Sequence, residues 1–403
     1  MILVVRNLNI YTYFTIFINL FYLPLFMDSK IDIIEEGKVK FYASSDATGK
    51  ISKELEVFYN PLMKTNRDIT ILVLNAIDQK DMQMCDLMAG SGVRSLRFLK
   101  ELNPGIIKSL VANDYDADFE ELFKKNMELN KISLDDKIII KNIDANKLLL
   151  ESKGFDYIDI DPFGSPNDFL ENSIIRLSRR GIFAVTATDT APLAGTFPDA
   201  CIRNYWAKPL RNYLMHETGL RILIRKIQLI GAQHDRALIP IFSYYKNHYF
   251  RIVFKCVKGK KRCDELLKQH NYLLFDDMNI VVSEFISGNN HPTQHVAPEY
   301  AGPLWTGRLW DEDLLKKIEQ NILKDDFVDK DFIRIILEES KINVIGFYDL
   351  HKLSQRYKFQ VPNFELVMQK IISKGYRASR THFSGYGIKT DMNVKDLLKI
   401  LLN

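Results

Sequence analysis

The feature that most constrains the fold is a regular alternation of strand-like and helix-like segments between Met84 and Thr188. Apolar runs of strand length end in Gly, Asp or Asn, and each is followed by a run with helical spacing of apolar residues. Strands that alternate with helices at this spacing form a parallel, doubly wound sheet. The predicted strands lie at 84–90, 109–114, 137–145, 155–162 and 181–188, and the predicted helices between and after them at 93–102, 117–130, 146–152 and 167–178.

Two further apolar runs, at 237–245 and 249–257, flank the sequence Lys246-Asn247-His248. This spacing predicts a β-hairpin with a tight turn. A parallel sheet that ends in an antiparallel hairpin resembles the Rossmann-like α/β fold of class I S-adenosylmethionine-dependent methyltransferases. The lysine-rich segment after the second strand predicts a domain boundary. We therefore expect a methyltransferase domain at 27–258 and a C-terminal α+β domain at 259–403.

Residues 1–26, MILVVRNLNIYTYFTIFINLFYLPLF, are nearly all apolar or aromatic, with one cation at Arg6. Such a run is typical of a signal peptide or a membrane anchor. Polar residues and Pro24 interrupt it, however, and no small-residue cleavage site follows. Met27 opens a polar segment with the character of an ordinary N-terminus. We expect the native start at Met27, with a real membrane tether as the alternative.

The net charge and the cysteine content limit the partners, disulfides and metal sites that the chain can have. The net charge of +4 is mild, so it permits a nucleic-acid partner without arguing for one. The chain has 4 cysteines and no CxxC pair, which excludes a disulfide framework and a standard zinc site. A reducing, cytoplasmic setting fits this composition.

Polar groups at successive strand ends predict a ligand site. Gly90-Ser91-Gly92 follows the first strand, where glycine lets the backbone approach a ligand closely. Asp114 ends the second strand, where an acid can bind both hydroxyls of a ribose. Asp144 ends the third strand and can accept a hydrogen bond from an adenine amino group. Asp86 lies at the exit of the first strand and can face an ammonium group. The chain has no GxGxxG and no GxxxxGK[ST], which counts against dinucleotides and triphosphates.

The fourth strand ends in YIDIDPFGSP, residues 157–166. Pro162 stops the strand, Phe163 can stack on a planar base, and Asp161 can accept a hydrogen bond from an exocyclic amine and then its proton. The segment resembles the [DNS]-P-P-[YFW] signature of methyltransferases that modify amino groups of nucleobases, with one proline missing. A capped helix start after a buried strand is the alternative reading.

Longer blocks carry a more specific resemblance. They are FYNPLMKTNRD, DLMAGSGVRSLRF, IDIDPFGSP, TATDTAPLAG, PDACIRNYWAKPLRNYLMHETGLRILI, GPLWTGRLWD and ASRTHFSGYGIKT, spread from Phe58 to Thr390. The chain is identified by them as a member of the tRNA (guanine-26-N2)-dimethyltransferase family, of the archaeal kind. The resemblance covers both predicted domains.

This resemblance implies that the chain transfers methyl groups from S-adenosylmethionine to N2 of guanine 26 in tRNA. It also implies site residues. Asp161 would be the catalytic carboxylate, which orients and deprotonates the amine. The implied cofactor contacts are Arg67, Arg94, Asp114, Asp144 and Ala145. The positions of Asp114, Asp144 and Asp161 at strand ends predict a site without the resemblance. Without it, we would interpret Arg67 and Arg94 as charges on the surface or on an exposed helix face.

Some members of the family carry paired cysteines just before the GPLW block. Here that region holds His291 and His295 and no cysteine, and two histidines are too few for a structural zinc. We therefore expect no metal.

Binding of tRNA requires cations that contact phosphates. Asp189 is a candidate second polar contact near the base, while Trp305 and Trp310 are expected in the core. The candidate phosphate contacts are Arg176, Arg179, Arg180, Lys255, Lys258, Lys260, Lys261, Arg262, Arg377, Arg380 and Lys389.

Three other functions are compatible with the sequence alone. One is a methyltransferase that acts on DNA or another RNA. Another is a non-catalytic tRNA-binding protein on a decayed methyltransferase fold, against which the intact Asp161 argues. The third is a membrane-tethered protein, supported only by residues 1–26. We expect a monomer that needs no protein partner.

Overall fold

A computed structural model describes residues 30–45, 59–276, 278–283, 299–322 and 328–402 of the chain. The expectations for residues 1–26, for Met27 and for His291 and His295 lie outside these residues. None of the helices in the described part is long and apolar enough to cross a bilayer.

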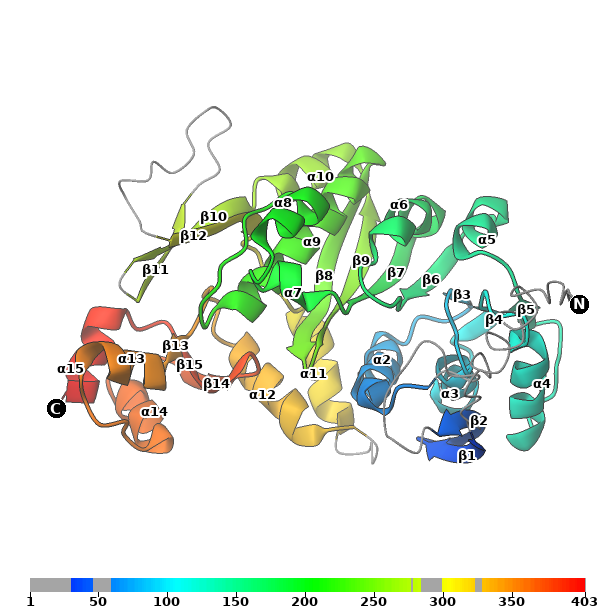
Figure 1. The fold of residues 1–403 in the computed structure, drawn as a ribbon, viewed down its shortest axis with the longest axis horizontal. Helices are drawn as coiled ribbons and strands as arrows, with labels where there is room; N and C mark the ends of the chain where they lie inside the picture. Colours follow the sequence, from blue (N-terminus) through cyan, green and yellow to red (C-terminus); the bar gives the residue numbers. More distant parts are fainter. Residues whose placement is uncertain (1–29, 46–58, 277, 284–298, 323–327, 403) are drawn as a thin grey trace, which may run out of the picture.

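The centre of the molecule is a seven-stranded sheet of order β5-β4-β3-β6-β7-β9-β8 (Figure 1). Its first five strands are parallel, and β9 pairs antiparallel with both β7 and β8. The fold class predicted from the alternation is thereby confirmed. The strands are β3 (Met82–Asp86), β4 (Ile107–Asn113), β5 (Ile138–Lys141), β6 (Phe155–Ile160), β7 (Leu177–Ala187), β8 (Arg236–Lys246) and β9 (Tyr249–Lys258).

Helices cover both faces of this sheet (Figure 1). On one face α5, α6 and α9 pack on one another in that order, and α9 lies against β8. On the other face α2 packs on α3, and α11 from the C-terminal part of the chain packs beside α2. The helices are α2 (Lys64–Ile77), α3 (Val93–Glu101), α4 (Phe119–Leu129), α5 (Ala145–Glu151), α6 (Asn167–Arg176), α7 (Thr190–Leu193), α8 (Pro198–Tyr205), α9 (Met215–Gln233) and α10 (Lys260–Leu267).

The predicted turn at Asn247-His248 joins β8 to β9, and Lys246 pairs with Tyr249 across it. Asn247 has a φ of 53°, a left-handed conformation that asparagine tolerates better than most residues. The hairpin prediction is confirmed.

Before the first strand of the sheet, the sequence DITILVLNAI predicts a helix with Asp68 as its N-cap. This start is wrong, because α2 begins at Lys64 and directly follows a short 3-10 turn, Pro61–Met63. The capping group is Asn60, whose side chain accepts from the Leu62 N–H at 2.9 Å. Asp68 lies inside the helix and is buried, because it pairs with Arg97 at 2.6 Å.

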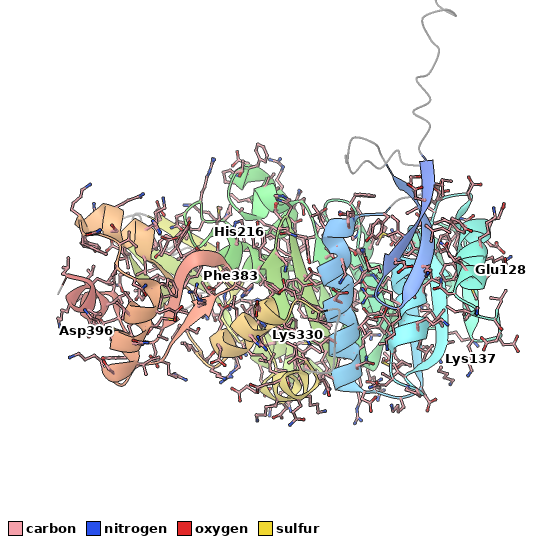
Figure 2. All side chains as sticks on the ribbon, turned by 90° about the horizontal axis from the view of Figure 1, so that it is seen from below. Glu128, Lys137, His216, Lys330, Phe383 and Asp396 are labelled. Carbon is pink, nitrogen blue, oxygen red and sulfur yellow. The ribbon has the colours of Figure 1, made fainter. Side chains whose placement is uncertain are left out.

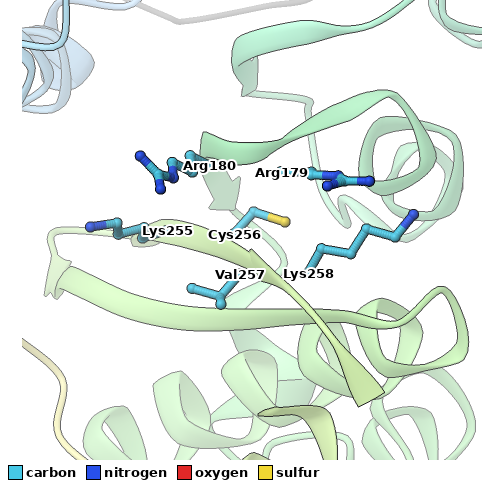
Figure 3. Close-up of a pocket in the computed structure, with 6 residues that line it drawn as sticks. All are labelled: Arg179, Arg180, Lys255, Cys256, Val257 and Lys258. Atoms are coloured by element: carbon cyan, nitrogen blue, oxygen red, sulfur yellow. The ribbon is translucent and has the colours of Figure 1, made fainter. Parts of the chain in front are cut away.

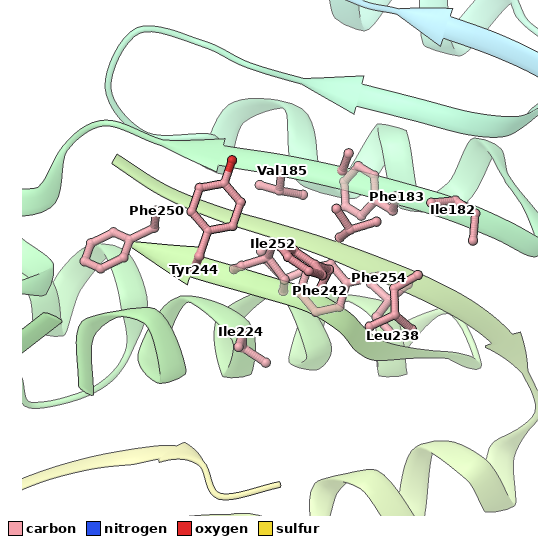
Figure 4. Close-up of a cluster of buried hydrophobic side chains, with 14 of the residues drawn as sticks. Ile182, Phe183, Val185, Ile224, Leu238, Phe242, Tyr244, Phe250, Ile252 and Phe254 are labelled. Atoms are coloured by element: carbon pink, nitrogen blue, oxygen red, sulfur yellow. The ribbon is translucent and has the colours of Figure 1, made fainter. Parts of the chain in front are cut away.

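The largest of three hydrophobic clusters in the described residues runs along the sheet and continues into the C-terminal part of the chain. Figure 4 shows its centre, where Phe183 of β7, Phe254 of β9 and Phe242 of β8 pack together. Ile318 of α11 and Ile336 of α12 belong to the same cluster. Figure 2 shows α12, marked by Lys330, on the same side of the molecule as α2.

The C-terminal part adds two small antiparallel sheets, of order β11-β10-β12 and β13-β15-β14. Trp305 and Trp310 are buried, as predicted, and donate from Nε1 to the carbonyls of Arg308 and Ser243, both at 2.9 Å. The division into domains at 258/259 stays a prediction. The elements are β10 (His270–Asp276), β11 (Asn279–Ser283), β12 (Glu299–Trp305), α11 (Glu312–Asn321), α12 (Lys330–Ser340), β13 (Tyr348–Asp349), α13 (Leu350–Tyr357), α14 (Phe364–Ser373), β14 (Ala378–Thr381), β15 (Ser384–Thr390) and α15 (Val394–Leu402).

Candidate active site

A cavity of about 770 Å³ opens at the carboxyl ends of β3, β4, β5 and β6. Ligands of open α/β sheets bind at this edge, because parallel strands deliver the loops that follow them to the same place. The six residues predicted from sequence and resemblance all line the cavity: Arg67, Arg94, Asp114, Asp144, Ala145 and Asp161.

The turn after β3 forms the floor beside Asp114. Gly90 and Gly92 have φ of 55° and 77°, and a Cβ added to Gly92 would lie 2.3 Å from the ring of Phe123. Only glycine fits that position without moving the ring. The N–H of Gly90 donates to Asp114 Oδ2 at 2.6 Å, so the turn holds this carboxylate at the end of β4.

Asp144 is the N-cap of α5, and its Oδ1 accepts from the Lys147 N–H at 2.9 Å. The cap fixes the carboxylate at the cavity wall. Ala145 follows as the first residue of the helix and also lines the wall.

Asp161 is the first residue after β6, and its side chain is 16% exposed, toward the cavity. Phe163 is half exposed and lines the same cavity. The turn between them is fixed to the end of β7, since the Gly164 N–H donates to Thr188 Oγ1 at 2.6 Å and the Thr188 N–H donates to the Gly164 carbonyl at 2.9 Å. The loop therefore presents a carboxylate and an aromatic ring to the same cavity.

Arg94 contacts both the Asp161 carboxylate and polar groups buried beneath the cavity. Its Nη2 donates to Asp161 Oδ2, and its Nη1 lies 3.2 Å from Asp159 Oδ2 and donates to Asn66 Oδ1 at 3.0 Å. The reading of Arg94 as a surface charge was wrong, because α3 starts directly beneath the cavity and buries its first turn.

Asp159 and Arg251 form a buried ion pair below Asp161. Arg251 of β9 donates from Nη1 to Oδ1 at 2.8 Å and from Nη2 to Oδ2 at 2.7 Å, and the Tyr157 hydroxyl donates to Oδ2 at 2.5 Å. Burial alone would raise the pKa of Asp159, but Arg251 and Arg94 hold it below its usual value. Asp159 therefore stays ionised and fixes the position of Arg94.

Arg67 was also read as a surface charge, and this too was wrong. It is buried beneath the hairpin formed by β1 (Lys30–Glu36) and β2 (Val39–Ser45), where Glu36 accepts from its Nε at 2.7 Å and its Nη2 at 2.5 Å. Arg97 pairs with Glu36 as well, at 2.8 Å. Burial alone would raise the pKa of Glu36, but Arg67 and Arg97 lower it to about 2.

Asp86 does not line the cavity, so the expectation that it faces an ammonium group there was wrong. It is 2% exposed and accepts from Ser95 Oγ at 2.8 Å beneath the first turn of α3. Burial raises the pKa of Asp86 to about 7, with Arg94 opposing the rise. The reason for its burial is that β3 continues to Asp86 itself and leaves the cavity edge to the five residues after it.

Three site residues were missed from sequence. Glu36 gave no signal, since it lies far from the other motifs in a polar segment. Asp159 and Arg251 gave one: each is a charge flanked by apolar residues within a strand, and Asp159 lies two residues before Asp161. A charge in such a place is buried only with a partner, so the two could have been paired.

Five of the eleven candidate cations for phosphate contact have partners within the protein. Arg176 donates to carbonyls of α5, and Lys389 is buried between two glutamates. Arg262 pairs with Glu265, Arg377 with Asp391 and Arg380 with Glu365. Asp189 does not line the cavity either and accepts from the Tyr205 hydroxyl at 2.6 Å.

Another group of cations has no such partner. Arg179 and Arg180 of β7 and Lys255 and Lys258 of β9 line a second pocket of about 640 Å³ (Figure 3). All four are exposed, and none makes an ion pair with any acid in the described ranges. We call these residues the basic pocket. It lies at the end of the sheet opposite to Asp161, because Arg179 and Arg180 are near the start of β7 and β9 runs antiparallel to it.

The donor set of the large cavity fits S-adenosylmethionine. Asp114 and Asp144 stand at adjacent strand ends, as an adenosine requires. Arg67, Arg94 and Lys125 are the cations of the described wall, which gives it positive charge for a ligand carboxylate. Asp161 and Phe163 line the same cavity after the end of β6.

Comparison with known proteins gives an independent result. The family described as N2,N2-dimethylguanosine tRNA methyltransferase matches residues 37–402. A tRNA (guanine(26)-N(2)/guanine(27)-N(2))-dimethyltransferase of Aquifex aeolicus is 36% identical over 383 residues, which cover 92% of this chain and 95% of that protein. A tRNA (guanine(26)-N(2))-dimethyltransferase of Methanosphaera stadtmanae is 35% identical over 384 residues, covering 92% and 96%.

A solved structure is similar over nearly the whole chain. It is Trm1 from Pyrococcus horikoshii in complex with S-adenosyl-L-methionine, with a TM-score of 0.82 and 34% identity. The alignment covers 92% of this chain and 99% of the Pyrococcus protein.

Proposed function

This chain belongs to the N2,N2-dimethylguanosine tRNA methyltransferase family, and we propose on that premise that Asp161 is its catalytic carboxylate. The chain is an S-adenosyl-L-methionine-dependent tRNA (guanine-26-N2)-dimethyltransferase. The observation that carries the proposal for Asp161 is its position: a partly exposed carboxylate at the end of β6, beside an exposed phenylalanine and at the mouth of the cofactor cavity.

The role of Asp161 follows from the chemistry of the amine. The lone pair of guanine N2 is conjugated into the ring, so the amine is a poor nucleophile until it is oriented. A carboxylate that accepts from one N2–H turns the lone pair out of the ring plane and then takes that proton. When bound, S-adenosyl-L-methionine supplies the electrophilic methyl group. Each transfer exchanges one N2–H for N2–CH3, and Asp161 passes the proton to solvent before the next.

Phe163 serves the same step by holding the base. Guanine 26 lies at a helical junction and must leave its stack to reach Asp161. A ring that is half exposed beside the carboxylate offers a stacking surface in place of the neighbouring bases. We propose in addition that Arg67, Arg94, Asp114, Asp144 and Ala145 bind the cofactor, since all five line its cavity.

The test of this function uses labelled S-adenosylmethionine and unmodified tRNA transcripts. We expect label in the wild-type transcript, recovered as N2-methyl- and N2,N2-dimethylguanosine, and none when guanine 26 is changed to adenine. A third transcript with guanine 27 changed separates the two positions, because the Aquifex relative is named for both. Equal label in the transcripts with and without guanine 26 would reject that position.

We propose that the basic pocket contacts phosphates of the bound tRNA. Four exposed cations without acidic partners repel one another, and a polyanion relieves that repulsion. Lys260 and Lys261 at the start of α10 extend the same positive surface. The pocket is about six residues along β7 from the active-site edge, or roughly 20 Å at the rise of a strand. A folded RNA that delivers one nucleotide to Asp161 spans such a distance.

Changing Arg179, Arg180, Lys255 and Lys258 together to glutamine is expected to raise KM for tRNA about tenfold with kcat unchanged. The slope of log Kd for tRNA against log salt should fall by about 2 to 4, roughly one for each lost phosphate contact. Filter binding over a salt series measures this. The control removes the same charge from lysines already paired on exposed helices, through glutamine at Lys124, Lys316, Lys341 and Lys399. If the slope of log Kd against log salt falls by the same amount in both variants, the basic pocket makes no specific contact.

A further inference from the structure

We propose that Asp161 and the carboxylate of the bound cofactor compete for Arg94, so that cofactor binding frees Asp161 to accept from the guanine amine. This inference rests on the proposed function of the same site. It makes Arg94 a positioning residue that sets the order of events: cofactor first, then base.

Three of the contacts of Arg94 are fixed and one is not. Asn66, Thr70 and Asp159 hold Nη1 from the interior, and all three residues are buried. Asp159 is held in turn by two hydrogen bonds from Arg251 and one from Tyr157. Asp161 is the partner at Nη2, and its side chain is the one in this set with exposure to the cavity. Arg94 can therefore exchange its cavity-side partner without losing its place.

The other cations of the cavity wall have their own acids. Arg67 donates twice to Glu36, and the Glu36 side chain is buried, so it cannot move away into solvent. Lys125 pairs with Glu121 at 2.6 Å on the surface of α4, on the side of Asp114. Asp114 and Asp144 mark the adenosine end of the cavity on β4 and β5. The carboxylate of the ligand therefore lies toward β3 and β6, where Arg94 is the cation with an exchangeable partner.

Without cofactor, Asp161 Oδ2 accepts from a guanidinium N–H of Arg94, which orients the carboxylate toward Arg94 and takes up one of its acceptor positions. With the ligand carboxylate present, two anions share one guanidinium and repel each other, which weakens the Arg94–Asp161 contact. Coupling of this kind is reciprocal: if the ligand carboxylate loosens Asp161, the charge of Asp161 must also weaken binding of that carboxylate.

The reciprocal effect gives a binding experiment that needs no turnover. Calorimetry would measure Kd for S-adenosylhomocysteine, whose sulfur is neutral, and for 5′-methylthioadenosine, which lacks the amino-acid end. We expect Asp161→Asn to tighten S-adenosylhomocysteine about tenfold and to leave methylthioadenosine unchanged. The control is Asp168→Asn, which removes a charge from the same cavity wall where no contact with Arg94 exists among the described side chains. It should change neither Kd by more than about twofold.

Arg94→Gln completes a double-mutant cycle. In that background Asp161→Asn should no longer tighten S-adenosylhomocysteine, because the shared cation is gone. Unchanged or weaker binding of S-adenosylhomocysteine by Asp161→Asn overturns the inference, and so does equal tightening of both ligands. Neither result bears on whether Asp161 is catalytic, which methyl transfer by Asp161→Ala decides separately.

Discussion

Replacement of Asp161 by alanine should lower kcat for methyl transfer by about 10³-fold while tRNA and cofactor still bind. Alanine removes both the acceptor that orients the N2 lone pair and the group that takes the proton, and each contribution is typically worth one to two orders of magnitude. Binding should survive because the phosphate and adenosine contacts lie elsewhere in the cavity and on the surface. Single-turnover transfer of labelled methyl groups at saturating tRNA measures the chemical step.

The control for this variant is Asp331→Ala, which removes an exposed carboxylate of α12 that does not line the cavity. It should retain the wild-type rate within about twofold. An Asp161→Ala enzyme that turns over normally would contradict the assignment and direct attention to another proton acceptor in the cavity.

Replacement of Arg251 by methionine is the second change with a large expected effect. It should lower the free energy of unfolding by about 3 kcal/mol, because it leaves Asp159 buried with only Arg94 and Tyr157 to balance its charge. Methyl transfer should fall as well, since Arg94 would then shift toward Asp159 and away from the cavity. Urea unfolding, followed by tryptophan fluorescence, measures the first effect.

A matched control is Arg334→Met on α12, where an exposed arginine pairs with Asp331 at 3.3 Å. Its loss should cost less than about 0.5 kcal/mol. The double variant Arg251→Met, Asp159→Asn should recover part of the stability, because it removes the unpaired charge together with its partner. If Arg251→Met is no more harmful than Arg334→Met, the buried pair does not support the site.

The sheet could be predicted because each of its elements is encoded locally. Strands buried on both faces read as continuous apolar runs, and the helices between them read as amphipathic. The tight turn at Asn247 made the hairpin of the last two strands, β8 and β9, equally predictable. The start of α2 was missed for a related reason: Asn60 caps a short turn that precedes the helix, so the cap lies eight residues before Asp68, where an apolar run had suggested the start.

The acids of the site were predictable from their position and the cations were not. Asp114, Asp144 and Asp161 each follow a strand, and strand ends converge in any parallel sheet. Arg67 and Arg94 lie within helices, where one sequence does not distinguish a buried arginine from an exposed one. Only the resemblance to the family marked them. Their burial depends on acids remote in sequence, Glu36 in the N-terminal hairpin and Asp159 on β6, which no local pattern connects to them.

The packing of α11 beside α2 has a consequence for synthesis of the chain on the ribosome. The Trp310 indole donates to β8 and the Asp311 N–H to the Ile241 carbonyl, so the methyltransferase sheet is completed by residues far beyond its last strand. At 5–20 residues per second, the interval between Lys258 and the end of α12 lasts on the order of 10 s. Throughout it the nascent sheet presents apolar surface that Ile318 and Ile336 will later cover. Nascent-chain binding by a chaperone should therefore peak within this window and end once α12 has emerged.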